Sequence, residues 1–157
     1  MASIRGIELK GVRTFRGVEW PVNYQGNVYY QGKKLGFWSQ DSWGGPDRYE
    51  FDTSELDAIA KDYYKGEQYF DLDCLLGEIL TLQDREKIYK KAVKDEYVSI
   101  LVMTDGYLEQ IIKFRTETDK DKILKSCEKY IKDFEAQSHQ KDKMETIVYT
   151  SLADFVQ

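Results

Sequence analysis

The sequence predicts an α+β protein, with a small antiparallel sheet of about four strands followed by helices, a β-hairpin, a long helix and a last strand. Residues 9–52 contain all three Trp, both Pro and most of the 11 Gly. Short aromatic and β-branched runs alternate there with glycine turns, as in antiparallel sheets. After residue 52, apolar residues mostly repeat with the helical period. We therefore expect a β-rich lobe over 1–52 and a helix/hairpin/helix/strand lobe over 53–157, which share one core or form two.

The strands of the first lobe are bounded by glycine, proline and polar residues, which interrupt a sheet. The Gln31-Gly32-Lys33 turn joins two of them into a hairpin over 28–40, because glycine supplies the backbone conformation that short hairpin loops need. Gly26 is a candidate bulge, and residues 13–17 predict a bend. The expected strands are 4–12, 22–24 with 27–30, 34–40 and 48–51.

The second lobe begins with a helix whose start has the spacing of a capping box, with Asp52 and Glu55 in the two positions. Gly66 is expected to end this helix. Apolar stripes predict the further helices, at 71–82, at 84–94 as a third helix or a bent extension, and at 118–136.

A second hairpin is predicted by two apolar runs, 97–103 and 107–115, around the Asp105-Gly106 dipeptide, which favours a two-residue loop. Residues 145–150 predict a last strand, and 152–156 an apolar docking segment.

The charge is uneven along the chain. The net charge is −5, and residues 53–83 carry seven acidic against two basic side chains. The chain lacks the basic stripe of a general nucleic-acid binder, so no direct sequence-specific nucleic-acid binding is expected. An acidic block instead suits a basic protein surface, including one that normally holds nucleic acid.

The remaining composition indicates a cytoplasmic protein. Cys74 and Cys127 stand alone on apolar helix faces, as reduced core residues do. The first residues lack the apolar region of a signal peptide, and no run has the length of a membrane span, so no membrane association is expected.

No residue pattern declares a catalytic site. His139 is the only histidine and lies in a polar stretch, where an exposed surface position is expected. Asp71 and Asp73 form a D-x-D pair that could hold Mg²⁺, but at a helix start carboxylates more often cap free N–H groups. Phosphate-binding glycine motifs are absent. We therefore predict no catalytic residue, no metal and no cofactor.

The residues best suited to binding a partner are aromatic, basic or acidic. Trp43, Arg48 and Tyr49 are of the types that anchor protein interfaces, although Trp43 could instead fold back over the end of the sheet. The acidic block adds charge complementarity. The predicted partner-binding residues are Trp43, Arg48, Tyr49, Glu55, Asp57, Asp62, Glu67 and Asp71.

Residues 9–52 carry a resemblance to a known group of proteins. The residues that carry it are Lys10-Gly11, Thr14-Phe15-Arg16-Gly17, Glu19, Gly32-Lys33-Lys34, Gly44-Gly45-Pro46 and Tyr49-Glu50. Their order and spacing resemble a family of small proteins carried by phages and other mobile elements of Gram-positive bacteria. Trp20-Pro21 departs from the family pattern, which has a glycine-aromatic pair there. The family has no assigned activity, so the resemblance implies a phage or mobile-element accessory origin and no functional residue.

These features together predict an accessory protein that acts by protein binding, as a stoichiometric inhibitor of a host defence nuclease. An anti-CRISPR-like role is expected, with a CRISPR effector nuclease or its guide complex as the host partner. Two alternatives stay open. One is a protein that sequesters a small ligand such as a nucleotide, and the other is a metal-dependent phosphoesterase or nuclease using Asp71 and Asp73.

Overall fold

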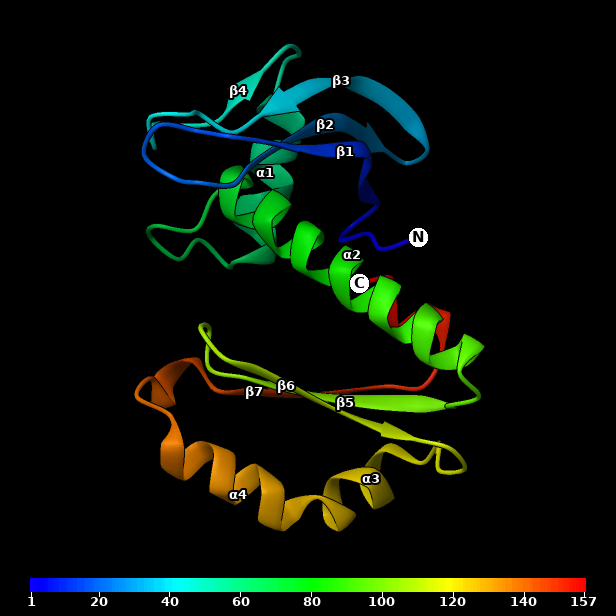
Figure 1. Cartoon of the computed structure of the whole chain (residues 1–157). Coiled ribbons are helices and arrows are strands. Elements are labelled where there is room, and N and C mark those ends of the chain that lie inside the picture. Colours follow the sequence, from blue (N-terminus) through cyan, green and yellow to red (C-terminus); the bar gives the residue numbers. More distant parts are fainter. The chain divides into compact units, whose positions relative to one another are not determined.

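The computed structural model describes all residues from Met1 to Gln157 and shows an α+β protein (Figure 1). It contains a four-stranded antiparallel sheet of order β1-β2-β3-β4 and a three-stranded sheet of order β6-β5-β7, together with four α-helices. None of the helices combines the length and the apolar character that a membrane span requires.

The chain forms two compact units, and the division falls after Asp84, inside the helix α2 (Leu72–Lys94). The first unit comprises residues 1–84 and 155–157, and the second comprises residues 85–154. The predicted lobe boundary at residue 52 does not coincide with this division, because the first helices bury their apolar residues with the first sheet. The chain's last residues also return to the first unit, where Ser3 N donates to Phe155 O and Gln157 N donates to Ser3 O.

The first sheet consists of β1 (Ile7–Phe15), β2 (Asn23–Tyr30), β3 (Lys33–Ser39) and β4 (Arg48–Tyr49). The predicted hairpin is confirmed, since Tyr30 pairs with Lys33 and both loop residues, Gln31 and Gly32, have positive φ. Residues 13–15 continue β1 and do not form the predicted bend.

The β-bulge expected at Gly26 lies instead on the strand opposite it. The β1–β2 register shifts between Lys10 and Arg13, so β1 carries the extra residue while Gly26 stays within the continuous strand β2. Gly11 takes the positive φ of +62° in this bulge, which glycine adopts at little cost.

The core of the first unit combines one face of this sheet with α1 (Ser54–Tyr63) and the first turns of α2. The side chain of Gln83 ties the two layers by donating to Leu9 O at 2.6 Å. The fully buried apolar residues are Ala2, Ile4, Ile7, Leu9, Val28, Trp38, Leu56, Ala60, Leu75, Leu76, Ile79 and Phe155.

One helix boundary was left open by the sequence, and another differs from the prediction. Of the two possibilities for 84–94, an extension of the preceding helix is the one observed, since α2 is continuous and the polar pair Gln83-Asp84 contains no helix breaker. The single helix expected at 118–136 is divided at Cys127 into α3 (Lys120–Ser126) and α4 (Glu128–Gln137). Ser126 lies at the break, and its hydroxyl donates to Ile123 O, an alternative to regular helix bonding.

The start and end of α1 also depart from the prediction. Asp52 accepts a hydrogen bond from Ser54 N, but the N-cap residue is Thr53, and the Glu55 carboxylate does not accept the reciprocal capping-box bond from Asp52 N. The helix ends at Tyr63, three residues before Gly66, which has a positive φ in the following turn.

In the second unit, β5 (Ser99–Thr104) is the central strand between β6 (Glu109–Phe114) and β7 (Glu145–Tyr149), and both pairings are antiparallel. The β5–β6 loop has four residues and not the predicted two, because the Asp105 carboxylate accepts hydrogen bonds from the backbone N–H of Tyr107 and Leu108. The short 3-10 helices η1 (Lys141–Lys143) and η2 (Leu152–Phe155) flank β7.

One face of the second sheet is covered by α3 and α4 (Figure 1). The buried cluster between them comprises Leu101, Met103, Ile123, Cys127, Phe134 and Val148. On the other face, Arg85 of α2 binds Glu109 at 3.2 Å, and the Tyr89 hydroxyl donates to Thr150 O at 2.8 Å. Both faces of β5 are therefore buried, as its continuous apolar run predicts.

Candidate functional site

Two loops of the first unit present exposed tryptophans. Trp20 lies between β1 and β2, Trp43 lies between β3 and β4, and their side chains are 60% and 67% exposed. The loops are joined because the backbone N–H groups of Val18 and Glu19 both donate to Ser42 O, at 2.8 and 3.1 Å. Since its side chain is exposed, Trp43 does not fold back over the sheet. Trp20 belongs to the same pair of loops.

The position of Trp20 is determined by two neighbours. The buried side chain of Asn23 donates to Trp20 O at 3.0 Å. Gly44 has a φ of +75°, and a Cβ added there would lie only 3.3 Å from Trp20 Nε1. The glycine thus supplies the backbone conformation and also allows the indole to approach the second loop.

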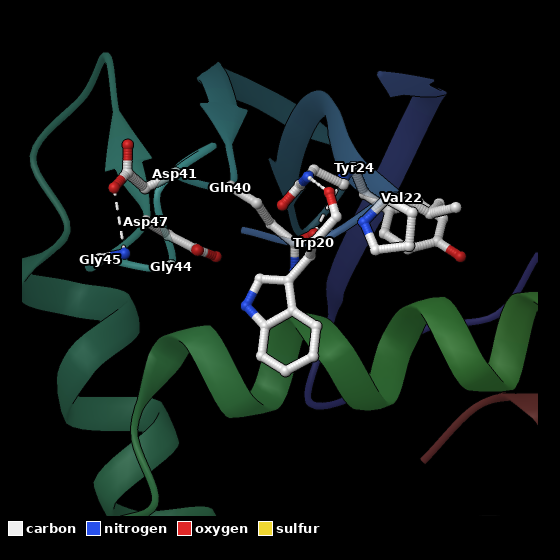
Figure 2. Close-up of a pocket in the computed structure, with 10 residues that line it drawn as sticks. Trp20, Val22, Tyr24, Gln40, Asp41, Gly44, Gly45 and Asp47 are labelled. Atoms are coloured by element: carbon white, nitrogen blue, oxygen red, sulfur yellow. Dashed lines mark hydrogen bonds between the residues drawn. The ribbon is translucent and has the colours of Figure 1, made fainter. Parts of the chain in front are cut away.

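A pocket of about 520 Å³ opens beside Trp20 (Figure 2). Within its lining, the Asp41 carboxylate accepts from Gly45 N at 3.0 Å and binds the Arg48 guanidinium at 3.1 Å. The pocket is therefore aromatic on one side and acidic on the other. The lining residues are Trp20, Pro21, Val22, Asn23, Tyr24, Gln40, Asp41, Gly44, Gly45 and Asp47.

Asp47 is the most perturbed acid of this pocket. Its pKa is raised from 3.8 to about 6, first by burial and then by the negative charges of Asp73, Asp71 and Asp41. The hydrogen bond from Trp38 Nε1 to Asp47 Oδ2, 2.7 Å long, acts in the opposite direction and favours the carboxylate. Asp47 is thus a half-buried carboxyl among other carboxyls.

Asp73 connects the start of α2 to the β4 segment. Its two oxygens accept from the Tyr49 hydroxyl at 2.5 Å and from Asp47 N at 3.1 Å. Burial and the hydrogen bond to Asp73 raise the pKa of Tyr49 far above its ordinary value. Asp71 accepts from Cys74 N at 3.1 Å, as a helix cap does, whereas Asp73 does not cap the helix.

The acidic block forms a second surface next to the first. A shallow pocket of about 270 Å³ is lined by Asp57, Lys61, Gly66, Glu67, Phe70, Asp71 and Leu72. Three of the predicted partner-binding acids therefore lie around one hollow. Tyr69 adjoins them with a φ of +83° and is 86% exposed, so its ring points into solvent.

The other predicted site residues have different surroundings. Arg48 remains exposed although it pairs with Asp41. Tyr49 is only partly accessible, since its hydroxyl binds Asp73 and its ring contacts Phe51 edge-on. Glu55 is exposed on α1, and Asp62 forms an ion pair with Arg5 at 3.8 Å, outside both pockets.

Sequence reasoning did not identify Trp20, Asp47 or Tyr69 as site residues. Trp20 was interpretable only as the residue before a chain-interrupting proline. The feature that could have identified Trp20 is its position in a glycine- and proline-rich loop, because aromatic residues in loops often contact binding partners.

The structure contains no group of three or more His, Cys, Asp or Glu residues arranged to hold a metal ion. The single histidine, His139, is exposed. No family model, curated protein or solved structure matches the chain.

Proposed function

We propose that this protein acts by binding another protein through the acidic and aromatic surface of its first unit. The observation that carries the proposal is the pair of joined loops that expose Trp20 and Trp43. Trp20 lines one pocket with Asp47, whose carboxyl lies near the charges of Asp73 and Asp71. Exposed tryptophans in a fixed backbone supply anchor area at little entropic cost.

The charge of this surface defines the kind of partner. Asp47, Asp71 and Asp73 form no ion pair with a basic side chain of the chain, and the negative charges of Asp73 and Asp71 add to burial in raising the pKa of Asp47. A basic partner surface would relieve this repulsion and accelerate association. Asp57 and Glu67, around the second pocket, extend the same negative surface.

The proposed partner is a host defence nuclease with a basic nucleic-acid groove, such as a CRISPR effector or its guide complex. An acidic protein that occupies such a groove inhibits stoichiometrically, because it competes with the phosphates that the groove normally holds. The resemblance of residues 9–52 to proteins of phages and mobile elements supports this biological setting.

The two alternatives receive less support from the site. A nucleotide could stack on Trp20 in the larger pocket, but the carboxylates of Asp41 and Asp47 would repel its phosphates. An enzyme using Asp71 and Asp73 would need these carboxylates free, and both already accept hydrogen bonds from within the chain.

To test the proposal, the tagged protein is used to capture its partner from a host lysate. The captured nuclease is then purified, and its inhibition by the protein is measured. A Trp43→Ala variant should lose at least about tenfold in affinity, the usual cost of truncating an interface anchor. The double variant Asp57→Lys/Glu67→Lys should slow association and weaken its dependence on salt, since opposite charges steer encounter.

A matched control is available in the second unit. Asp133 and Glu135 are exposed on α4, so Asp133→Lys/Glu135→Lys changes the net charge by the same amount away from the proposed surface. This control should bind and inhibit as the unmodified protein does. Inhibition that survives both Trp43→Ala and Asp57→Lys/Glu67→Lys would refute the surface assignment, and a protein that retains no host protein would refute the function.

A further inference from the structure

We propose that the pocket beside Trp20 binds an arginine side chain of the partner, with the guanidinium held between the Trp20 indole and the Asp47 carboxyl. This inference rests on the proposed function and specifies the chemistry of its partner. Figure 2 shows the Trp20 indole and the Asp47 side chain extending from the two joined loops into the same open space.

The indole is a prepared surface for a cation. Asn23 holds the Trp20 backbone, and Gly44, which lacks a Cβ, lets the indole nitrogen edge approach the second loop. The ring nevertheless remains 60% exposed, so a face is available for stacking. Guanidinium groups stack on tryptophan more readily than any other charged side chain, because they are planar and weakly hydrated.

Asp47 supplies the acceptor. One of its oxygens, Oδ2, accepts from Trp38 Nε1, whereas Oδ1 forms no hydrogen bond within the chain. The carboxyl has no basic partner, unlike Asp41, which pairs with Arg48. Burial raises the pKa of Asp47 first, and the negative charges of Asp73, Asp71 and Asp41 raise it further. A bound cation would compensate these charges in place of a proton.

The remaining walls suit the arginine stem. Pro21 and Val22 are apolar and line the pocket on the Trp20 side, where the methylene groups of a long side chain can pack. A lysine would lose more hydration and could not make planar, bidentate contacts. The pocket therefore favours arginine over lysine.

The experiment uses the full chain labelled with ¹⁵N and N-acetyl-arginine amide as the probe. The three Trp indole N–H signals report separately on the pocket, the core and the second loop, and Trp20→Phe assigns the first of them. The arginine probe should shift the Trp20 signal saturably, and the neutral isostere N-acetyl-citrulline amide should not. Asp47→Asn, which retains an acceptor for Trp38, should lower the affinity for the arginine probe about tenfold or more.

The outcomes separate this inference from the proposed function. No shift at Trp20, or an equal shift by the citrulline probe, would overturn the arginine pocket even if a host nuclease is still inhibited. Saturable arginine binding with no captured host protein would uphold the pocket and refute the proposed function. If Asp47→Asn does not fold, Trp20→Ala provides the second test, because this exposed residue can be truncated without opening the core. Trp20→Ala should abolish the response of the backbone amides that line the pocket to the arginine probe.

Discussion

The hydroxyl of Tyr49 donates a 2.5 Å hydrogen bond to the carboxylate of Asp73, which stands 24 positions later in the chain. The other oxygen of the same carboxylate accepts from Asp47 N. A single side chain at the start of α2 therefore fixes both the short strand β4 and the loop that carries Asp47. The candidate site depends on this contact, because the loop exposing Trp43 ends at the segment that Asp73 holds.

The first prediction concerns this hydrogen bond. Tyr49→Phe should lower the free energy of unfolding by about 1.5–3 kcal/mol, since the bond joins a half-buried donor to a charged acceptor. Urea unfolding followed by tryptophan fluorescence measures it, because all three Trp lie in the first unit. Tyr107→Phe is the control, as Tyr107 is highly exposed. Equal stability of the two variants would contradict the assigned role of Asp73.

The parts of the fold that the sequence predicts correctly are those determined locally. The hairpin over 28–40 follows from its turn residues, and the buried strand β5 follows from an apolar run. The sequence left open whether residues 84–94 extend the helix before them. The break at Cys127 was not predictable from apolar periodicity, which continues across it.

The candidate site was predictable only in part for a similar reason. The type of residue suggests Trp43 and the acidic block. Trp43 is exposed, and Asp57, Glu67 and Asp71 line one pocket, while the binding role of these residues stays a prediction. The grouping of Asp47 with Asp73, and of Trp20 with Gly44, arises from contacts between residues far apart in the sequence. Spacing along a chain carries no information on such contacts.

The second prediction is a pH dependence due to Asp47. Its pKa is about 6 in the folded protein and 3.8 in its ordinary state, so between these values the folded state binds more protons than the unfolded state. The contribution of Asp47 to stability is therefore present below pH 3.8 and is lost as the pH rises through about 6.

Asp47→Asn should remove this dependence, so the variant should gain stability relative to the unmodified protein as the pH rises from about 4 to about 7. Urea midpoints measured across this range provide the comparison. Asp133→Asn, which changes an exposed carboxyl on α4, should differ from the unmodified protein in stability by the same amount at every pH. A constant offset between Asp47→Asn and the unmodified protein at every pH would show that Asp47 titrates in its ordinary range.

The third prediction contrasts two glycines of the first unit. A Cβ at Gly36 in β3 would lie 2.8 Å from Phe51 Cδ1 and 3.0 Å from Glu50 O, so Gly36→Ala should cost about 1–3 kcal/mol through overpacking. A Cβ at Gly77 within α2 would meet nothing within 4 Å, so Gly77→Ala should stabilise by about 1 kcal/mol through helix propensity. If Gly36→Ala and Gly77→Ala change the free energy of unfolding in urea in the same direction, the packing of β3 against the segment after β4 is contradicted.

The fourth prediction concerns the return of the chain's last residues to the first unit. Phe155 is fully buried there, next to the backbone bridge between Ser3 and Val156. Phe155→Ala should therefore lower the free energy of unfolding of the first unit by about 3–5 kcal/mol, through lost burial and the cavity that remains. Val156→Ala is the matched control, because its side chain is mostly exposed and should cost no more than about 0.5 kcal/mol. The tryptophan signal reports the first unit directly, so an unchanged urea midpoint for Phe155→Ala would show that these last residues contribute nothing to its core.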